Sequence, residues 1–285
     1  YHLGVLYNNG DGVPQDYKEA VRWWRLAAEL GFVEAHNNLG IMYEQGLGVS
    51  QDYKEAVRWY TLAAKQGYAT AQYNLGSMYH KGLGVPQDDK EAVRLLKPLA
   101  EEGDADAQNN LGVIYENGDG VPQDYKEAVR WYALAAEQGN ATAQKNLGSM
   151  YQKGDGVPQD YKEAERWYLL AAEQGKVSAQ YNLGVLYSNG KGVPQDYKKA
   201  VRWYALAAEQ GDVDAQYNLG LMYFFGEGVP QDNVYAHMWW NIAASTGDDD
   251  AKANKKIVEK KMTSSQIEEA QRLARKCVKK NYKGC

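Results

Sequence analysis

Residues 107–139 read AQNNLGVIYENGDGVPQDYKEAVRWYALAAEQG, and variants of this stretch follow one another along the chain. The glycine at its sixth position recurs every 36 residues, at Gly4, Gly40, Gly76, Gly112, Gly148, Gly184 and Gly220. A fixed period of this length is typical of solenoids built from stacked supersecondary units. We therefore expect an all-α chain of seven repeats, each burying its apolar face against its neighbours.

Each repeat is expected to form two antiparallel helices. The apolar residues of 107–115 are spaced as on one face of a helix, and this helix stops at Gly118. After a short loop, Asp124 is placed to cap a second helix, and Glu127 to complete a capping box. Gly139 is the expected left-handed terminator of that helix. Nothing in the repeat predicts a strand.

Composition agrees with a folded helical array. Hydrophobic residues make up 44% of the 285 residues, and the formal net charge is −5. No apolar run approaches the roughly twenty residues that a membrane-spanning helix requires, so we expect no transmembrane segment. The chain begins at Tyr1, in the middle of a predicted helix, and the first repeat is therefore expected to be truncated at its N-terminus.

The repeat pattern A-x-x-x-L-G-x-x-Y-x-x-G-x-G-V-x-x-D-x-x-x-A-x-x-W-Y-x-x-A-A-x-x-G resembles the Sel-1-like repeat (SLR) family, a relative of the tetratricopeptide repeats. The resemblance covers residues 1–251 and implies a right-handed superhelical solenoid of antiparallel helix pairs. Members of that family resemble one another in being scaffolds or adaptors. The resemblance therefore implies a non-enzymatic, monomeric protein that binds a protein or peptide on its concave groove, with no cofactor, metal or nucleic acid.

The resemblance also implies where the partner binds, because tetratricopeptide repeats face their groove with particular first-helix positions. Two residues before the glycine lies a row of asparagines: Asn38, Asn74, Asn110, Asn146, Asn182 and Asn218. Three residues before it the repeats vary, and the candidates are Tyr73, Lys145, Tyr181 and Tyr217. Four and five residues after the last glycine are Phe224 and Phe225, where other repeats are polar.

Two interpretations of these positions remain open. The asparagine amides can donate to and accept from an extended peptide backbone. They can equally stitch neighbouring helices together, as buried polar groups normally must be paired. Phe224 and Phe225 form either an apolar anchor for the partner or a contact for the terminal helix. The variable tyrosines suit an exposed interface.

Other recurrent aromatic residues are expected to lie in the core, because aromatic residues at helical spacing usually pack. One row follows the Leu-Gly pair: Tyr43, Tyr79, Tyr115, Tyr151, Tyr187 and Tyr223. The other row is on the second helices: Trp59, Trp131, Trp167 and Trp203.

Residues 252–285 differ from the repeats. They carry a net charge of +8, whereas residues 1–251 carry −13. Thr263 and Gln266 predict a capping box at the start of a final helix with one apolar stripe. We expect this helix to close the last repeat, with its lysines forming a solvated face. A basic patch for nucleic acid or an anionic membrane is the alternative.

Both cysteines, Cys277 and Cys285, lie in this last segment. The seven residues between them allow the tail to fold back and form a disulfide. A disulfide favours a periplasmic or secreted protein, and reduced thiols a cytoplasmic one. A zinc site is less favoured, since it normally needs four ligands.

The sequence offers two alternative functions. The acidic repeats suit an immunity or inhibitor protein that covers a basic secreted effector, as in some bacterial proteins that resemble this one. A weak cell-wall hydrolase of the penicillin-binding type would use Ser188 and Lys191, which match S-x-x-K. Its companion motifs are missing from the sequence, and the four histidines lie in different repeats.

Overall fold

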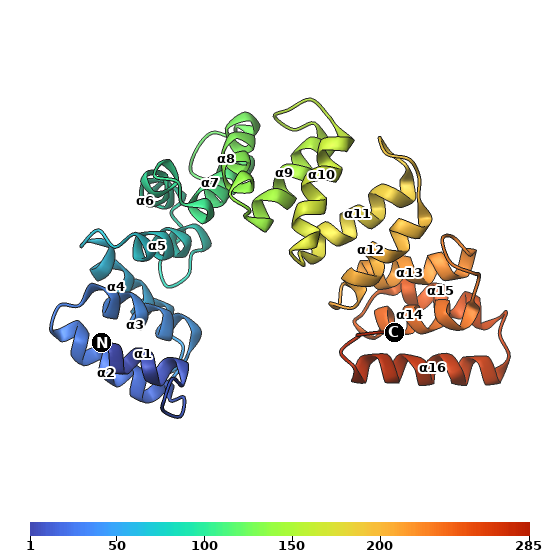
Figure 1. Cartoon of the computed structure of the whole chain (residues 1–285), viewed down its shortest axis with the longest axis horizontal. Helices are drawn as coiled ribbons and strands as arrows, with labels where there is room; N and C mark the ends of the chain where they lie inside the picture. The colour runs from blue at the N-terminus through green and yellow to red at the C-terminus, as the bar shows by residue number, and fades with distance from the viewer. The chain divides into compact units, whose positions relative to one another are not determined.

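The computed structural model describes residues 1–285, and all of its regular elements are helices (Figure 1). The chain divides into two units, Tyr1–Gln138 and Gly139–Cys285. Unit 1 contains α1 (His2–Asn9), α2 (Tyr17–Glu29), α3 (Val33–Gln45), α4 (Tyr53–Ala64), α5 (Ala69–Lys81), α6 (Asp89–Glu101), α7 (Ala105–Asn117) and α8 (Tyr125–Glu137). Unit 2 contains α9 (Ala141–Lys153), α10 (Tyr161–Glu173), α11 (Val177–Asn189), α12 (Tyr197–Ala208), α13 (Val213–Phe225), α14 (Asn233–Ser245), α15 (Asp249–Glu259) and α16 (Ser264–Lys279).

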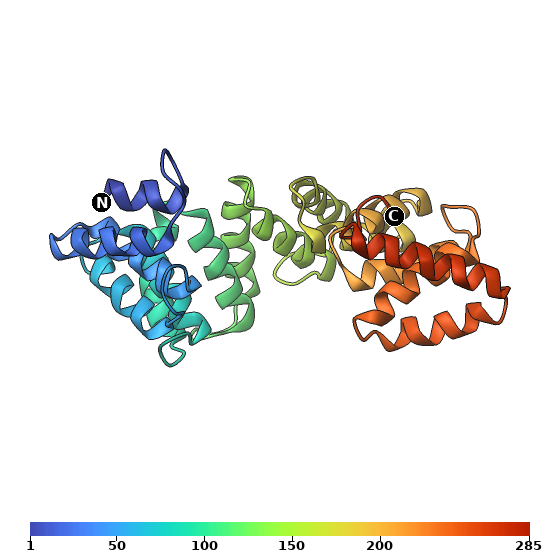
Figure 2. The ribbon, with the colours of Figure 1, turned by 90° about the horizontal axis from the view of Figure 1, so that it is seen from below.

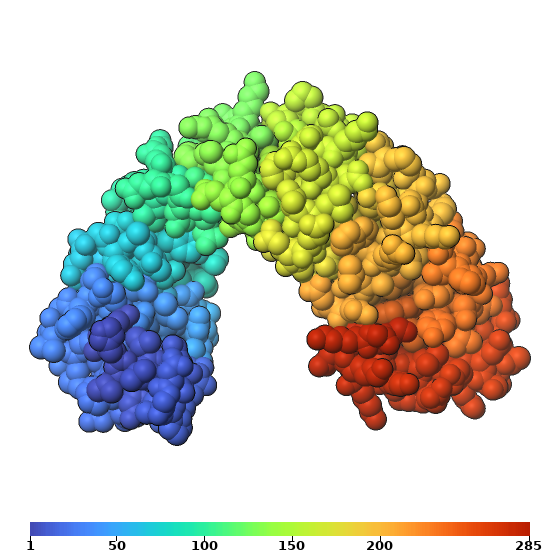
Figure 3. Space-filling model, viewed as in Figure 1, coloured from blue at the N-terminus to red at the C-terminus, as the bar shows by residue number.

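Within each unit the helices from α1 to α14 form consecutive antiparallel pairs. The odd-numbered helix of a pair is called its first helix here and the even-numbered one its second. Inside a unit each pair packs on the next, as the ribbon shows from two directions (Figures 1 and 2). In the space-filling view each unit is a series of bands in sequence order (Figure 3). The expected all-α array of helix pairs is confirmed.

The recurrent aspartate starts the second helices as predicted. Asp124 Oδ1 accepts from the backbone amides of Lys126 at 2.9 Å and Glu127 at 3.2 Å. The capping box predicted with Glu127 is not formed, however. The Glu127 carboxylate pairs with Arg130 at 3.2 Å, because the arginine lies one turn further along the same helix face.

The recurrent glycine lets the two helices of a pair approach closely. A Cβ added at Gly184 would lie 2.5 Å from Cδ1 and Cε1 of Tyr204. The same clash with the second helix's aromatic ring occurs at Gly40, Gly112 and Gly148, which meet Tyr60, Tyr132 and Tyr168. The glycine therefore recurs because a buried ring of the second helix lies where a Cβ would be.

These buried rings correct the predicted core. The most buried recurrent aromatic residues are Tyr60, Tyr132, Tyr168 and Tyr204, each one residue after a tryptophan of the expected row. Of that row Trp131 and Trp167 are buried, and Trp59 and Trp203 are half-buried. In the Leu-Gly-x-x-Tyr row only Tyr187 is buried, and the other five pack on the edge of the core.

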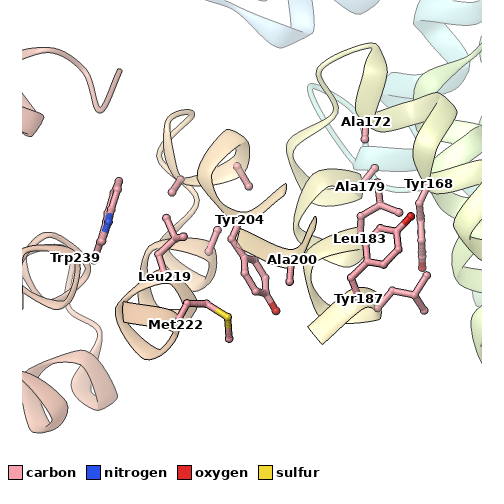
Figure 4. Packing of buried hydrophobic residues seen from close by; sticks show 14 of the residues in the cluster. Tyr168, Ala172, Ala179, Leu183, Tyr187, Ala200, Tyr204, Leu219, Met222 and Trp239 are labelled. Atoms are coloured by element: carbon pink, nitrogen blue, oxygen red, sulfur yellow. The ribbon is translucent and has the colours of Figure 1, made fainter. Parts of the chain in front are cut away.

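Alanine, leucine and the buried tyrosines fill the core of unit 2 from one pair to the next. Figure 4 shows Leu183 with Tyr168 and Tyr187 on one side of this core, and Tyr204 beside Ala200. Small alanines on the second helices leave room for these rings. The core is therefore a continuous strip of contacts between neighbours, as expected for a repeat protein.

In several repeats the loop inside a pair touches the preceding pair of the same unit. Gly48 has φ 69°, and an added Cβ would lie 2.3 Å from the carbonyl oxygen of Tyr17, the first residue of α2. Gly84 and Gly228 approach Tyr53 and Tyr197 in the same way. A side chain at these positions would push the loop away from the previous second helix.

The C-terminal segment continues the array. Asp248 caps α15 by accepting from Ala251 N at 2.6 Å, as Asp212 caps α13 through Ala215 N at 2.8 Å, 36 residues earlier. The boundary that we expected after residue 251 therefore lies inside α15. The capping box of Thr263 and Gln266 is present at the start of α16. Helix α16 packs on α14 and closes unit 2 (Figure 2).

The two cysteines are bonded in the structure. Cys277, near the end of α16, is joined to Cys285 with a Cα–Cα distance of 5.4 Å. The tail between them reaches back to the sixth repeat, where the backbone amide of Gly284 donates to Glu209 Oε1 at 3.0 Å. None of the helices combines the length and the apolar character needed to cross a membrane.

Candidate binding surface

The predicted groove positions recur on the first helices of each unit, and we call this set of positions the first-helix face. It consists of the first-helix side chains three and two residues before the recurrent glycine and one, four and five after it. The asparagine row contacts the preceding first helix here. Asn74 Nδ2 donates to Asn37 Oδ1 at 3.1 Å, and Asn110 Nδ2 donates to the hydroxyl of Tyr73 at 3.3 Å.

Unit 2 repeats this arrangement. Asn218 hydrogen-bonds the hydroxyl of Tyr181 on the preceding first helix, whereas Asn182 hydrogen-bonds that of Tyr168 on the preceding second helix. The row also has a member that our sequence analysis missed, Asn254, whose Nδ2 donates to Tyr217 OH at 3.1 Å. Asn254 lies 36 residues after Asn218, so the period itself would have found it.

The variable tyrosines are therefore held by their neighbours. Tyr73, Tyr181 and Tyr217 are half-buried, each with its hydroxyl bonded to an asparagine of the next repeat. Burial raises the pKa of Tyr73 and Tyr181 above the usual value of 10.0, and the asparagine hydrogen bond opposes this rise. Both therefore present a neutral ring edge to the first-helix face. Lys145 is half-buried and Asn146 is buried.

A second row of amides, which we did not single out from the sequence, ties the helix pairs together. Gln108 Nε2 donates to the carbonyl of Ala100 in the preceding second helix at 2.9 Å. Its Oε1 accepts from Gln138 Nε2 at 2.8 Å. Gln180 repeats both contacts in unit 2, with Ala172 and Gln210. These buried glutamines therefore pair with a backbone carbonyl of the preceding second helix, as buried polar groups normally must.

Unit 1 contains a cavity of about 580 Å³ on its first-helix face. Groove positions of two successive repeats line it: Asn8 and Asn9 of α1, and Asn38, Ile41 and Gln45 of α3. Trp24 forms part of its wall and is 3% exposed. The Trp24 indole N–H has no acceptor within the protein.

The two phenylalanines at the end of α13 differ in their surroundings. Phe224 is half-buried against Trp240, with ring centroids 5.5 Å apart, and Lys261 Nζ lies 4.5 Å from its ring centroid. Phe225 is 61% exposed. Phe224 thus contacts the chain that follows the last repeat, whereas Phe225 projects toward solvent.

Ser188 and Lys191, the two residues of the S-x-x-K match, form no hydrogen bond with each other. Ser188 Oγ donates to the carbonyl of Val185 at 3.1 Å and lies 3.3 Å from the Tyr204 hydroxyl. Lys191 is exposed in the loop after α11. Ser188 therefore extends the hydrogen bonding of a buried ring.

Comparison with known proteins identifies the family of the chain. The Sel1 repeat model matches seven consecutive segments, residues 1–32, 33–68, 69–104, 105–140, 141–176, 177–212 and 213–248. The chain belongs to the Sel1 repeat family. Each Sel1 repeat after the first begins at or next to the start of a first helix, so α15 and α16 lie outside the matched repeats.

Solved structures agree with this assignment. A Sel1 repeat protein from Oxalobacter formigenes is 39% identical with a TM-score of 0.76, over 90% of this chain and 74% of that one. The protective antigen c5321 of uropathogenic Escherichia coli, which has an SLR fold, is 29% identical with a TM-score of 0.55, over 99% and 84%. Immunity protein Pa5087 of Pseudomonas aeruginosa, 20% identical with a TM-score of 0.50 over 75% and 81%, shares the fold. A comparison with curated proteins found no match.

Proposed function

We propose that this Sel1 repeat protein is a non-enzymatic, monomeric scaffold that binds a protein or peptide segment along its first-helix face. The observation that carries the proposal is the cavity in unit 1, because equivalent groove positions of two successive repeats line it. Repetition of equivalent positions is how solenoids bind extended partners.

The chemistry of the cavity fits a peptide backbone. The amide side chains of Asn8, Asn38 and Gln45 offer donors and acceptors around an apolar floor of Ile41. The buried ring of Trp24 adds an apolar wall, and its indole nitrogen lies against Gly4.

Selection from a phage-displayed peptide library on the whole chain tests the proposal. We expect enriched peptides whose affinity falls about tenfold in Asn38→Ala while the free energy of unfolding stays unchanged. Asn74→Ala is the matched control. Its amide is already bonded to Asn37, so its loss should cost about 1 kcal/mol of stability instead. If no peptide is enriched, or if changes on this face leave binding unaffected, the proposal is wrong.

The acidic repeats favour a second candidate, an immunity protein for a basic effector enzyme. A net charge of −13 over residues 1–251 would speed association with a cationic partner. Such a protein would bind one partner very tightly, with affinity that falls steeply as salt is added. Weak salt dependence together with enrichment of several different short peptides would exclude it.

We also infer that the protein works in an oxidising compartment, in the periplasm or outside the cell. The Cys277–Cys285 bond supports this inference, because thiols of cytosolic proteins normally stay reduced. Alkylation of the native protein before mass determination should find no free thiol. Two labelled thiols would place the protein in the cytoplasm.

A further inference from the structure

The seventh repeat changes the chemistry of the first-helix face at the end of α13. Four and five residues after the glycine, the six earlier repeats carry only polar side chains: Asn8 and Asn9, Glu44 and Gln45, His80 and Lys81, Glu116 and Asn117, Gln152 and Lys153, and Ser188 and Asn189. The seventh carries Phe224 and Phe225 at these positions. Two adjacent aromatic residues here call for a physical reason.

Packing inside the repeat accounts for Phe224. In the second and fourth repeats the equivalent residue accepts from a buried tyrosine, as Glu44 does from Tyr60 at 2.6 Å. In the seventh repeat that tyrosine is replaced by Trp240, whose Nε1 donates to the carbonyl of Tyr217 at 3.1 Å. Phe224 then packs on the indole as an apolar substitute for the lost hydrogen bond.

Packing does not account for Phe225. Its ring meets Phe224 edge-on, with centroids 5.0 Å apart, and 61% of the residue stays exposed. The equivalent Asn117 and Asn189 show that a polar residue ends a first helix here equally well. Exposed aromatic residues of this kind are typical anchors in protein interfaces.

Helix α15 extends the apolar surface beside Phe225. Asn254 contacts Tyr217, and Lys261, seven residues later, contacts Phe224, which is seven residues after Tyr217. Helices α13 and α15 therefore run parallel and in register. Ile257, between the two contacts, lies level with Leu221 and is 48% exposed.

The edge of this surface is positively charged. Lys256 near the end of α15 and Lys260 and Lys261 just after it are exposed, and none of them forms an ion pair. Glu259, the carboxylate among them, is held by the buried His237, with 2.9 Å between Oε1 and Nε2. The lysines therefore remain available to carboxylates of another molecule.

We propose that these residues form an anchor site for a partner segment in which an aromatic or branched aliphatic side chain stands next to Asp or Glu. The site, which we call the apolar–cationic patch, comprises Leu221, Phe224, Phe225, Ile257 and Lys261. The apolar side chain of the partner packs on Phe225 and Ile257, and its carboxylate pairs with Lys261. The proposal rests on the proposed function and names the chemistry of one end of the first-helix face.

The same peptide selection tests the patch, followed by affinity measurements on the enriched peptides by fluorescence polarisation. Peptides that combine an apolar residue with neighbouring Asp or Glu should be enriched. We expect Phe225→Asn to weaken their binding about tenfold or more. This substitution introduces the residue that α11 carries at the equivalent position, Asn189. Lys261→Glu should weaken them several-fold and remove most of the salt dependence.

A matched control separates binding at this site from non-specific hydrophobic binding. Leu206 is 43% exposed on the second helix α12, so Leu206→Asn removes similar apolar surface elsewhere in unit 2 and should leave the affinities unchanged. Equal binding by the wild type and Phe225→Asn, or enrichment of basic peptides at this site, overturns the patch. If the peptides instead depend on Asn38 alone, the patch is wrong and the proposed function stands. If no peptide depends on the first-helix face, both fail.

Discussion

Adding one methyl group at Gly40 should destabilise unit 1 measurably. The Cβ of Gly40→Ala would lie 2.4, 2.5 and 3.0 Å from Cε1, Cδ1 and Cζ of Tyr60. Carbon atoms in van der Waals contact stay about 3.5–4 Å apart, so the overlap is about 1 Å. Tyr60 cannot easily move away, because it is fully buried and its hydroxyl is bonded to Glu44.

The expected magnitude follows from two opposing effects. Overpacking a close-packed core costs about 1–3 kcal/mol, and a rigid ring held at both ends places Gly40→Ala near the upper limit. Replacing glycine by alanine inside a helix returns about 1 kcal/mol through helix propensity. We therefore expect a net loss of about 2 kcal/mol in the free energy of unfolding, measured by urea denaturation with circular dichroism.

The third repeat supplies the control in the same unit. At Gly76 the nearest atoms are Cγ and Cδ2 of Leu96, at 2.9 and 3.1 Å, and an aliphatic side chain adjusts more easily than a ring. Gly76→Ala should therefore be close to neutral, and Tyr60→Leu should reduce the cost of Gly40→Ala by about 1 kcal/mol or more in a double-mutant cycle. Equal effects of the two alanines, or no coupling with Tyr60, would refute this account of the glycine period.

Three further predictions concern caps, pH and the disulfide. Asp124→Ala should lower the free energy of unfolding, measured by urea denaturation, by about 1 kcal/mol. Glu127→Ala should lower it by only about a few tenths of a kcal/mol, because Glu127 makes only an exposed ion pair. Equal losses would indicate that Glu127 does complete a capping box. Burial lowers the pKa of His237 below its ordinary 6.5, with Glu259 opposing, so stability should fall as the pH drops below 6.5, where the unfolded chain takes up the proton first. His237→Gln should flatten this dependence in thermal melts, and a slope unchanged by the substitution would contradict it. Cys277→Ser removes a disulfide with a sequence separation of 8 and should lower the free energy of unfolding of unit 2 by about 2.5 kcal/mol. If reductant leaves the stability of the wild type unchanged, the disulfide has no structural role.

The sequence predicts the helix pairs well because their determinants are local. A glycine that ends each first helix and an aspartate that caps each second one act within a few residues of their own positions. The buried rings were harder to predict. Trp131 and Tyr132 are adjacent on the inner half of α8, so periodicity alone does not choose between them. The choice depends on Gly112 in another helix, because the ring of Tyr132 occupies the space where a Cβ of that residue would lie.

The candidate surface was predicted as a set of positions and not as a set of contacts. The spacing locates Asn74 and Asn110 on one face of their helices, but their partners lie one repeat away. Gln108 was missed because a glutamine in a helix usually indicates an exposed residue, and only the stacking of helices buries it. Phe225 was predicted from its departure from the other repeats, while its exposure depends on where α15 ends.

The glutamine and asparagine contacts have a consequence for how such a chain changes length. Gln108 bonds the carbonyl of Ala100 at the end of the preceding repeat, and Asn74 bonds Asn37, 37 positions earlier, so each contact joins two consecutive repeats. Recombination that removes or duplicates exactly 36 residues inside a unit would therefore recreate the same junction chemistry at the new joint. A deletion of any other length would leave a buried amide opposite the wrong side chain. Gene rearrangement can thus lengthen or shorten the array in whole periods while every surviving junction keeps its bonds.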